Sequence, residues 1–553
     1  MENFKKQSTL ISTMLFIWVC TIFYFNPRLI ALLIGNEPFI AKLSVILFIL
    51  TLDLLWLYGI YHITHILFSY FITNKNPIFK KSLVDENQPY VAVFYTTKND
   101  FNSNACKSCL NQDYKNYKLF ICDDSDNLNV KNQIKQFVSS NKNTIEYSER
   151  IDRKGFKAGN INNALRNLDK KYEYILVTDS DSELPKDFIS RLMPYFKSDN
   201  SIAFVQAMQK NGTLSNTEFS KNMDPLISIH YNHYVINKNV YGHSMWFGHG
   251  AILRRDVIDE IGGIPEIVTE DLAFSSEIRR FGYQGVIATD VWSFEATPED
   301  ILRFRIRNRK WVRGTFEYFI KYFPKILISG KISWFEKLDI LISGFSLLQA
   351  LPFLIFVFIA SFTMPLYYTA QNIKGPFFLI PPILYDSWYG VVLNTRYNVF
   401  WSWDFYLIMI ITIFSPLLPV MWDLRKEKIK MFKFLLMTTF INLSLLFDSA
   451  KEIISYLLTR KNIFTVTGDI NFSKEKPVFL ITELILGLSL SFYAFKTYNL
   501  WLLSLALAMI ITPFWLRTRP NALLMVLSSI PFFMTSVITF LIGITLIQDM
   551  LIS

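Results

Sequence analysis

The sequence predicts an α/β domain inserted between groups of apolar, membrane-spanning helices. Of the 553 residues, 51% are hydrophobic and 16% are aromatic, which is high for a soluble protein. Apolar runs of about 20 residues, the length that crosses a bilayer, flank one long polar stretch from Asn74 to Arg313. Within that stretch, short apolar runs typical of strands alternate with helical patterns, which favours a largely parallel sheet covered by helices.

The apolar runs predict seven membrane spans. They cover residues 8–26, 42–72, 338–369, 403–422, 477–497, 499–516 and 521–548. The segment Phe23–Pro27 after the first run has no small-residue cleavage site, so we interpret this run as a retained anchor rather than a signal peptide.

The basic residues predict which flanks are cytoplasmic. The net charge of +10 is compatible with a nucleic-acid partner, but the cations cluster beside apolar runs, as they do on cytoplasmic loops. These cations are Lys5, Lys6, Lys75, Lys80, Lys81, Arg425, Lys426, Lys428 and Lys430. The predicted outer loop, 370–402, carries only Lys374 and Arg396. We therefore expect a multi-pass plasma-membrane protein with a cytoplasmic insert, in contact with lipid and with no nucleic-acid partner.

The predicted organisation has six parts. They are two N-terminal spans (1–73), the cytoplasmic α/β domain (74–315), interfacial helices (316–337), two spans (338–428), an interfacial helix with a loop (429–475) and three spans (476–553). The stretch Met431–Leu458 is apolar enough to cross but contains four charged residues, so we prefer an interfacial position. If it crosses, the protein has eight spans, and Arg460 and Lys461 lie outside.

The cysteines do not predict a disulfide framework. There are four, of which Cys20 lies in a span and three lie in the predicted cytoplasmic domain. Cys106 and Cys109 form a single CxxC motif, for which we do not expect a redox or metal role.

Two of the predicted strands end in acidic residues. The predicted strands are Val91–Tyr95, Lys118–Cys122, Tyr174–Thr178 and Ile202–Gln206; Asp123-Asp124 follows the second and Asp179-Ser180-Asp181 follows the third. Ligands of open α/β sheets bind beyond the carboxyl ends of the strands, so both acidic groups should face one crevice. Asp179 and Asp181 suit a divalent cation that also contacts phosphate, although an Asp-Ser-Asp turn that caps a helix has the same composition.

Further charged segments extend the candidate site. Thr269-Glu270-Asp271 begins a helical pattern, and either helix capping or an arm of the same site explains it. The small and cationic residues of Arg153–Asn162 suit the close approach of a diphosphate, but also suit a solvated loop. The cations from Arg303 to Arg313 surround Trp311, as in a basic helix at a lipid surface.

Taken in order, five segments resemble the family 2 glycosyltransferases, in particular the processive, membrane-integrated branch of cellulose, chitin and hyaluronan synthases. The segments are Thr97-Lys98-Asn99-Asp100, Asp123-Asp124, Lys157-Ala158-Gly159-Asn160, Asp179-Ser180-Asp181 and Thr269-Glu270-Asp271. The resemblance covers about 90–315 and continues into the membrane region. It implies a GT-A-type, Rossmann-like cytoplasmic domain inserted in an α-helical transmembrane domain.

The resemblance also implies a role for each segment. Thr97, Asn99, Asp100, Asp123, Asp124, Lys157 and Asp179 would bind a UDP-sugar, UDP-glucose or UDP-N-acetylglucosamine, with Asp123 on the base. Asp179 and Asp181 would hold Mg²⁺ or Mn²⁺ with the diphosphate. Asp271 would be the general base that activates a sugar hydroxyl, with Glu270 beside it in the catalytic pair.

The sequence departs from the family pattern at two places. The usual Gln-x-x-Arg-Trp is here Arg307-Asn308-Arg309-Lys310-Trp311, so Trp311, Arg307 and Lys310 are the acceptor-binding candidates. Phe464-Thr465-Val466-Thr467 resembles a Phe-x-Val-Thr gating loop, with Asp469 in place of a lysine. Phe464, Val466 and Thr467 are therefore the candidates for a loop that closes over the nucleotide.

The predicted function is that of a hexosyltransferase. It would transfer sugar, with inversion, from a UDP-sugar to a growing β-linked polysaccharide and move the product across the membrane. A non-processive enzyme with a glycolipid acceptor explains the motifs nearly as well, whereas a transporter with a regulatory domain explains only the spans.

Overall fold

The computed structural model describes residues 7–71, 88–142, 144–212, 217–363, 403–462, 477–496, 499–515 and short pieces of 529–544. The chain divides into two compact units. Unit 1 comprises Met1–Ile11, Phe68–Leu347 and Glu452–Ser473, and unit 2 comprises Ser12–Leu67, Leu348–Lys451 and Lys474–Ser553.

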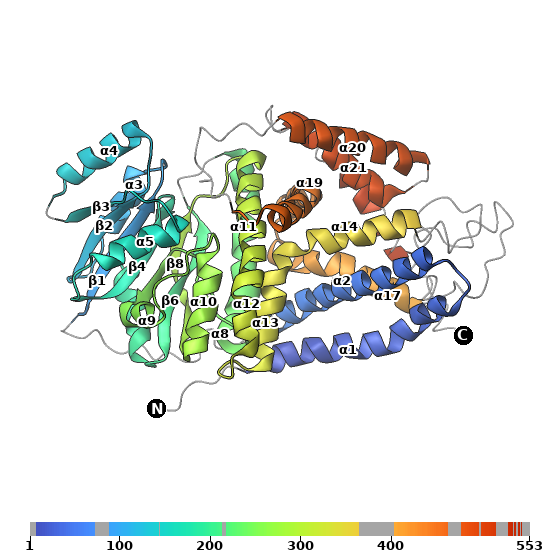
Figure 1. The fold of residues 1–553 in the computed structure, drawn as a ribbon, viewed down its shortest axis with the longest axis horizontal. Coiled ribbons are helices and arrows are strands. Elements are labelled where there is room, and N and C mark those ends of the chain that lie inside the picture. Colours follow the sequence, from blue (N-terminus) through green and yellow to red (C-terminus); the bar gives the residue numbers. More distant parts are fainter. Residues whose placement is uncertain are drawn as a thin grey trace. The chain divides into compact units, whose positions relative to one another are not determined.

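Unit 1 is built on one eight-stranded sheet of order β3-β2-β1-β4-β7-β6-β8-β5 (Figure 1). The strands are β1 (Tyr90–Thr97), β2 (Tyr117–Asp123), β3 (Ile145–Glu149), β4 (Tyr172–Asp179), β5 (Ser182–Glu183), β6 (Ile202–Asn211), β7 (Ala251–Arg254) and β8 (Gln284–Glu295). All four predicted strands are present, as β1, β2, β4 and β6.

The sheet is mixed rather than largely parallel. Strands β3, β2, β1 and β4 run parallel, but β7 pairs antiparallel with both β4 and β6, and β5 pairs antiparallel with β8. β7 has only four residues, and its apolar run is too short to be recognised as a strand in the sequence. This strand interrupts the parallel order.

Both faces of the sheet are buried. Along β1, Val91, Val93 and Tyr95 enter one apolar cluster, while Ala92 and Phe94 enter the other. The continuous apolar strands seen in the sequence follow from this double burial. Cys106 and Cys109 are buried, reduced members of the first cluster, so the CxxC motif belongs to the core.

Helices cover the sheet and extend past it. They are α3 (Ser103–Leu110), α4 (Leu128–Ser139), α5 (Phe156–Arg166), α6 (Phe188–Leu192), α7 (Glu218–His230), α8 (Ile236–Tyr241), α9 (Arg255–Glu260), α10 (Glu270–Phe281), α11 (Ile301–Lys321), α12 (Phe323–Ile328) and α13 (Trp334–Phe345). Helices α10 to α13 share their own cluster, which includes Leu272, Tyr318, Ile326 and Ile340. The helix that begins with Glu270 is therefore packed against α11 and α13.

Unit 2 is helical. Its described helices are α1 (Thr9–Ile30), α2 (Phe39–Phe71), α14 (Ala350–Phe358), α17 (Trp403–Phe414), α18 (Leu418–Asp423), α19 (Lys428–Thr459), α20 (Pro477–Lys496) and α21 (Leu500–Trp515), of which α1, α2 and α19 extend into unit 1 at one end. Polar contacts join the apolar helices, since Asn26 donates to Asp53 at 2.7 Å and Arg28 pairs with Asp404.

Several described helices are long and apolar enough to cross a membrane. Four stretches qualify, Thr9–Ile34, Phe39–Phe71, Trp403–Asp423 and Lys428–Thr459, and a bent pair, Trp334–Leu348 with Ala350–Thr363, adds a fifth if it counts as one span. Length and composition thus allow α19 to cross. The predicted outer loop 370–402 lies outside the described residues.

Candidate active site

Acidic residues gather at one edge of the sheet. In the parallel register, Thr97 is paired with Asp123 and Thr96 with Asp179, so β1, β2 and β4 end together. The Thr96 hydroxyl donates to Asp179 Oδ1 at 2.9 Å. The structure therefore brings the two predicted acidic groups to the same edge, as the strand pattern predicts.

The turn after β1 holds three of the candidate residues. The Thr97 hydroxyl and the Lys98 N–H each donate to Asp100 Oδ1 at 2.8 Å. Asn99 has a positive φ of 64°, and its side chain bonds Asp126 on the neighbouring loop. Burial raises the pKa of Asp100, and the charge of Asp179 adds to that rise. The turn is thus fixed beside the acidic edge.

Asp123 and Asp124 have different surroundings. Asp123 is buried, and it accepts from the Ser125 N–H at 2.8 Å and from the Tyr147 hydroxyl at 2.9 Å. Asp124 accepts two bonds of 2.7 Å from the guanidinium of Arg150. Arg150 also donates to the carbonyl oxygen of Lys154, in the loop before α5, and to that of Phe156, the first residue of the helix. The carboxylate of Asp124 therefore braces this loop, while Asp123 lies at the strand end.

Asp179 and Asp181 have pKa values that are shifted in opposite directions. Asp179 forms an ion pair with Lys157, and although burial would raise its pKa, that cation holds it below the usual range. Burial raises the pKa of Asp181 to about 7, and the nearby charge of Asp179 contributes to this rise. A proton and a cation compete for such a pair of carboxylates.

Lys157 connects the strand end to the third acidic group. It lies in the first turn of α5, after Gly155, whose φ of 75° starts the helix. Its ammonium donates to the carbonyl oxygen of Gly248 at 2.9 Å and pairs with Asp179. Burial lowers the pKa of Lys157, but the charges of Asp179 and Glu270 outweigh burial and raise it.

Gly248 lies against Glu270, Asp271 and Lys157. A Cβ atom at Gly248 would lie 3.6 Å from a carboxylate oxygen of each acid and 3.7 Å from Lys157 Nζ, and φ here is +83°. Burial raises the pKa of Glu270 to about 8, with a contribution from Asp271. Burial also raises the pKa of Asp271 to about 6. Burial thus shifts both carboxyl groups toward their protonated forms, and it shifts Glu270 further than Asp271.

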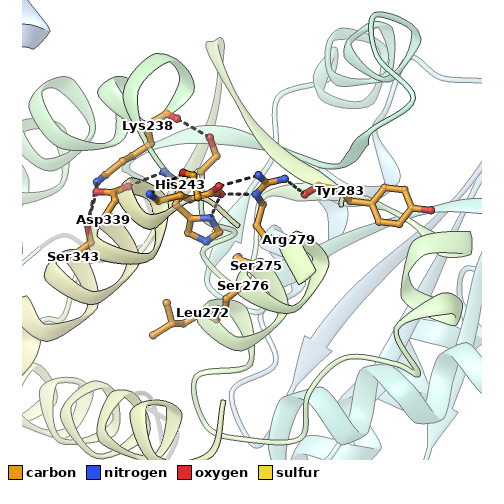
Figure 2. Close-up of polar contacts among 12 residues, drawn as sticks. Lys238, His243, Leu272, Ser275, Ser276, Arg279, Tyr283, Asp339 and Ser343 are labelled. Carbon is orange, nitrogen blue, oxygen red and sulfur yellow. Dashed lines mark hydrogen bonds and ion pairs between the residues drawn. The ribbon is translucent and has the colours of Figure 1, made fainter. Parts of the chain in front are cut away.

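Helix α10, which carries both acids, is fixed along its length. Ser275 accepts from the Trp246 N–H at 2.8 Å, and so ties the helix to the segment before Gly248. Near the other end of the helix, Arg279 bonds both oxygens of Glu336 in α13. Figure 2 shows Asp339, also in α13, beside Lys238 and His243; Asp339 pairs with Lys238 and accepts from the His243 N–H at 2.7 Å. The buried ionic network thus fixes the axis of α10.

The acceptor candidates lie on α11. Arg307 stacks over Trp311, with 4.7 Å from its guanidinium carbon to the ring centre, and the indole is 40% exposed. Burial lowers the pKa of Arg307 and of Lys310, and the charges of Glu295 and Asp179, respectively, oppose that change. Both cations are therefore within electrostatic reach of the acidic edge. Phe464, Val466 and Thr467 lie outside the described residues.

Sequence reasoning missed a buried polar group beside this edge. His249 lies 3.1 Å from Glu295 Oε2 and 3.1 Å from Ser182 Oγ. Burial lowers the pKa of His249, but Glu295 and Asp179 outweigh burial and raise it. The glycine-rich segment Phe247–Ala251 was visible in the sequence, yet Glu295 is distant in the chain. Tyr147 and Arg150 were also missed, because their contacts with Asp123 and Asp124 depend on tertiary packing.

Asp179 and Asp181 fit a divalent cation only if a bound substrate supplies further oxygen ligands. Among the residues described here, no group of three or more His, Cys, Asp or Glu side chains is arranged to hold a metal. Asp179 and Asp181 supply two carboxylates, and the pKa of Asp181 is raised first by burial and then by the nearby charge of Asp179. Mg²⁺ in proteins is commonly held by one or two carboxylates and by substrate phosphates. The pair suits that arrangement.

Residues 174–415 match the family described as glycosyl transferase family group 2. The match includes Asp179, Asp181, Glu270, Asp271 and Trp311. The chain carries a family 2 glycosyltransferase domain. The mixed sheet with acids at its carboxyl edge confirms the predicted GT-A-like fold of this domain.

The glycosyltransferase domain has curated relatives. A UDP-forming cellulose synthase, the catalytic chain of the enzyme from Dictyostelium discoideum, is 32% identical over 186 residues, which are 32% of this chain and 17% of that protein. Probable glucomannan 4-beta-mannosyltransferase 11 of Oryza sativa subsp. japonica is 26% identical over 226 residues, 40% of each chain. The matches thus span less than half the length of these relatives.

A solved mannosyltransferase from Pyrobaculum calidifontis, in complex with GDP-Man and Mn²⁺, is 16% identical to this chain, with a TM-score of 0.45. That comparison covers 69% of this chain and 99% of the other. At this distance the likeness indicates neither substrate nor metal.

Proposed function

We propose that this chain is a membrane-embedded enzyme that transfers a hexose from a UDP-sugar to a growing β-linked polysaccharide. The observation that carries the proposal is the convergence of Asp179, Lys157, Glu270 and Asp271 around Gly248. One acid pair at a strand end suits a divalent cation that would bind a diphosphate, and the second lies beside it on a fixed helix. A donor and an attacking hydroxyl can therefore meet between them.

The two carboxyl groups of α10 suit different tasks. Asp271, with a pKa of about 6, is available as a base at neutral pH, whereas Glu270, at about 8, is protonated and can donate a hydrogen bond. Environments that separate the pKa values of neighbouring acids are typical of acid–base sites. Asp271 would take the proton from the acceptor hydroxyl as it attacks the anomeric carbon from the face opposite the diphosphate, which inverts configuration.

The donor would lie along the edge formed by β1, β2 and β4. Thr97, Asn99 and Asp100 fix the turn there, Asp123 offers its carboxylate to the base, and Asp124 holds the loop that leads to Lys157. Lys157 would bind the diphosphate. Asp179 and Asp181 would hold Mg²⁺ or Mn²⁺, which would neutralise the charge that develops on the departing diphosphate.

Trp311 would support the acceptor sugar. An exposed indole offers a flat apolar face to a sugar ring, and Arg307 and Lys310 lie on the same helix beside the carboxylates. The change from Gln-x-x-Arg-Trp favours a second candidate, single transfer to a lipid acceptor, because the polar groups near the acceptor differ. The length of the product separates the two.

We further propose a cytoplasmic catalytic domain, with α19 in the interface and seven spans in the plasma membrane. Glu452 and Ser455, near the end of α19, contact Arg313 of α11, so this end lies on the side of the catalytic domain. The cations Arg425 and Lys426 favour the same side for its beginning. An eight-span arrangement would separate the two ends.

A donor screen tests the function. Protein purified in lipid nanodiscs is incubated with a panel of UDP- and GDP-sugars and Mg²⁺ or Mn²⁺, and release of the nucleoside diphosphate is measured. The product is then sized and digested with linkage-specific hydrolases. We expect one UDP-hexose to give a long β-linked polymer; a single added sugar supports the lipid-acceptor candidate, and no turnover with any donor contradicts both.

A further inference from the structure

Helix α11 is held between two parts of unit 1. On one side, Gly314 approaches the N-terminus of α10 so closely that a Cβ atom there would lie 2.7 Å from Thr269 Cγ2 and 3.3 Å from Thr269 N. Thr269 precedes the two acids, Glu270 and Asp271. Trp311 lies one turn earlier on the same side of α11, since residues three apart lie about 60° from one another around a helix.

The opposite side of α11 contacts the end of α19 and the residues after it. Arg313 lies about 200° around the helix from Trp311. Its guanidinium is 2.7 Å from Glu452 Oε2 and donates to Ser455 Oγ at 2.7 Å. Phe316 packs edge-on against Tyr456, with ring centres 5.9 Å apart.

A second polar contact continues this interface. Asn462 bonds Glu317, one turn after Arg313, and the backbone oxygen of Lys461 accepts from Arg313 at 3.4 Å. The Arg313 and Glu452 side chains are only 9% and 11% exposed. Breaking a buried ion pair by removing one partner is far more damaging than breaking a surface pair. These contacts therefore fix α11 from the side away from Trp311.

We propose that Arg313 is a positioning residue for the acceptor and acts through its contacts with Glu452 and Ser455. We call these contacts the clasp. The inference rests on the proposed transfer reaction and adds a residue that none of the motifs contains. A rigid helix that loses its outer contact shifts Trp311, Arg307 and Lys310 relative to Asp271. The donor-binding residues lie on β1, β2, β4 and α5, so they keep their places. Loss of the clasp thus affects transfer and spares donor binding.

A charge exchange tests the clasp. Arg313→Glu and Glu452→Arg are made singly and together, and three quantities are measured: UDP affinity, donor hydrolysis without acceptor, and polymer formation. Displacement of reacting groups by about 1 Å costs about 100-fold in rate. We expect each single variant to bind UDP normally, to form polymer about 10- to 100-fold more slowly and to hydrolyse a larger share of the donor. The double variant should recover at least about tenfold, because the pair is restored with its charges reversed.

Two further variants keep the test decisive. Arg313→Lys retains the charge but loses the guanidinium whose Nη2 contacts both Glu452 and Ser455. Its activity should be intermediate, and it serves if the charge reversals fold poorly. Arg191→Gln removes an arginine of the distant helix α6 that pairs with Asp290, and serves as the control. Unchanged polymer formation in the Arg313 and Glu452 variants overturns the clasp, as does a double variant no better than the weaker single one. A wild-type protein inactive with every donor instead overturns the proposed function, and the clasp's role with it.

Discussion

Lys157 forms an ion pair with Asp179 while its ammonium donates to the carbonyl oxygen of Gly248. One side chain thus links the end of β4 to the glycine that lies beside Glu270 and Asp271. The cation lowers the pKa of Asp179, and it opposes the rise that burial causes in the pKa of Asp271.

Substitution of Lys157 should therefore change both binding and pH dependence. In Lys157→Gln the positive charge that lowers the pKa of Asp271 is lost, so this pKa rises above about 6. We expect the acid limb of the kcat/KM profile to move to higher pH and the KM for donor to increase. Lys154→Gln is the control, because this lysine lies in the same loop and its side chain is 87% exposed. An unmoved limb would contradict the assignment of Asp271.

Glu270 should tolerate an isosteric amide. Its pKa of about 8 means that it is protonated at neutral pH, and glutamine mimics that form. Activity of the wild type should fall as pH decreases through about 6, because Asp271 must be ionised. In Glu270→Gln we expect this acid limb to stay near 6 and activity at pH 7 to remain within about tenfold. A loss as large as that of an Asp271 variant would assign the base to Glu270.

The metal prediction has a readout independent of turnover. Affinity for UDP, measured by titration calorimetry, should increase with Mn²⁺ or Mg²⁺ and return to the metal-free value after EDTA. Asp181→Asn removes one charged oxygen ligand, so we expect it to weaken the metal-dependent part by about 10- to 100-fold. Asp152→Asn, on an exposed loop, should have no effect. Equal UDP affinity with and without metal in the wild type would refute the metal site.

The Arg279–Glu336 pair should stabilise unit 1. Burial would raise the pKa of Glu336, but Arg279 and His243 hold it far below its usual value of 4.5. A depressed carboxyl pKa stabilises the fold fully above the usual value, and this stabilisation is lost gradually as pH falls from there through the folded-state pKa. Glu336→Gln should cost about 3 to 5 kcal/mol at pH 7 and less near pH 3, seen in melting temperatures. Glu146→Gln, in the exposed Lys118–Glu146 pair, should cost under about 1 kcal/mol.

The sequence predicted the strands that carry the acids because they are buried on both faces and read as continuous apolar runs. It also predicted that Asp123 and Asp179 lie at one edge, since parallel strands end together. It did not predict β7, whose four residues are too few to show a pattern. The mixed order of the sheet follows from this short strand and from β5, which also pairs antiparallel.

The contacts that position the candidate site were less accessible from the sequence. Glu336 lies 57 residues after Arg279, and Glu452 lies far along the chain from Arg313. Pairs of this kind depend on tertiary packing rather than on local spacing. Gly248 was visible as part of a glycine-rich segment. Its approach to Asp271 could not be predicted, because it depends on how the segments around both residues fold.

The measurement that tests the central claim most directly compares wild type with Asp271→Asn. Both proteins are given the UDP-sugar found in the donor screen, with metal, and both UDP binding and sugar incorporation are recorded. We predict equal UDP affinity and an incorporation rate about 100- to 10,000-fold lower in the variant, the usual effect of losing a general base. Incorporation by Asp271→Asn at a rate near that of the wild type would contradict the account.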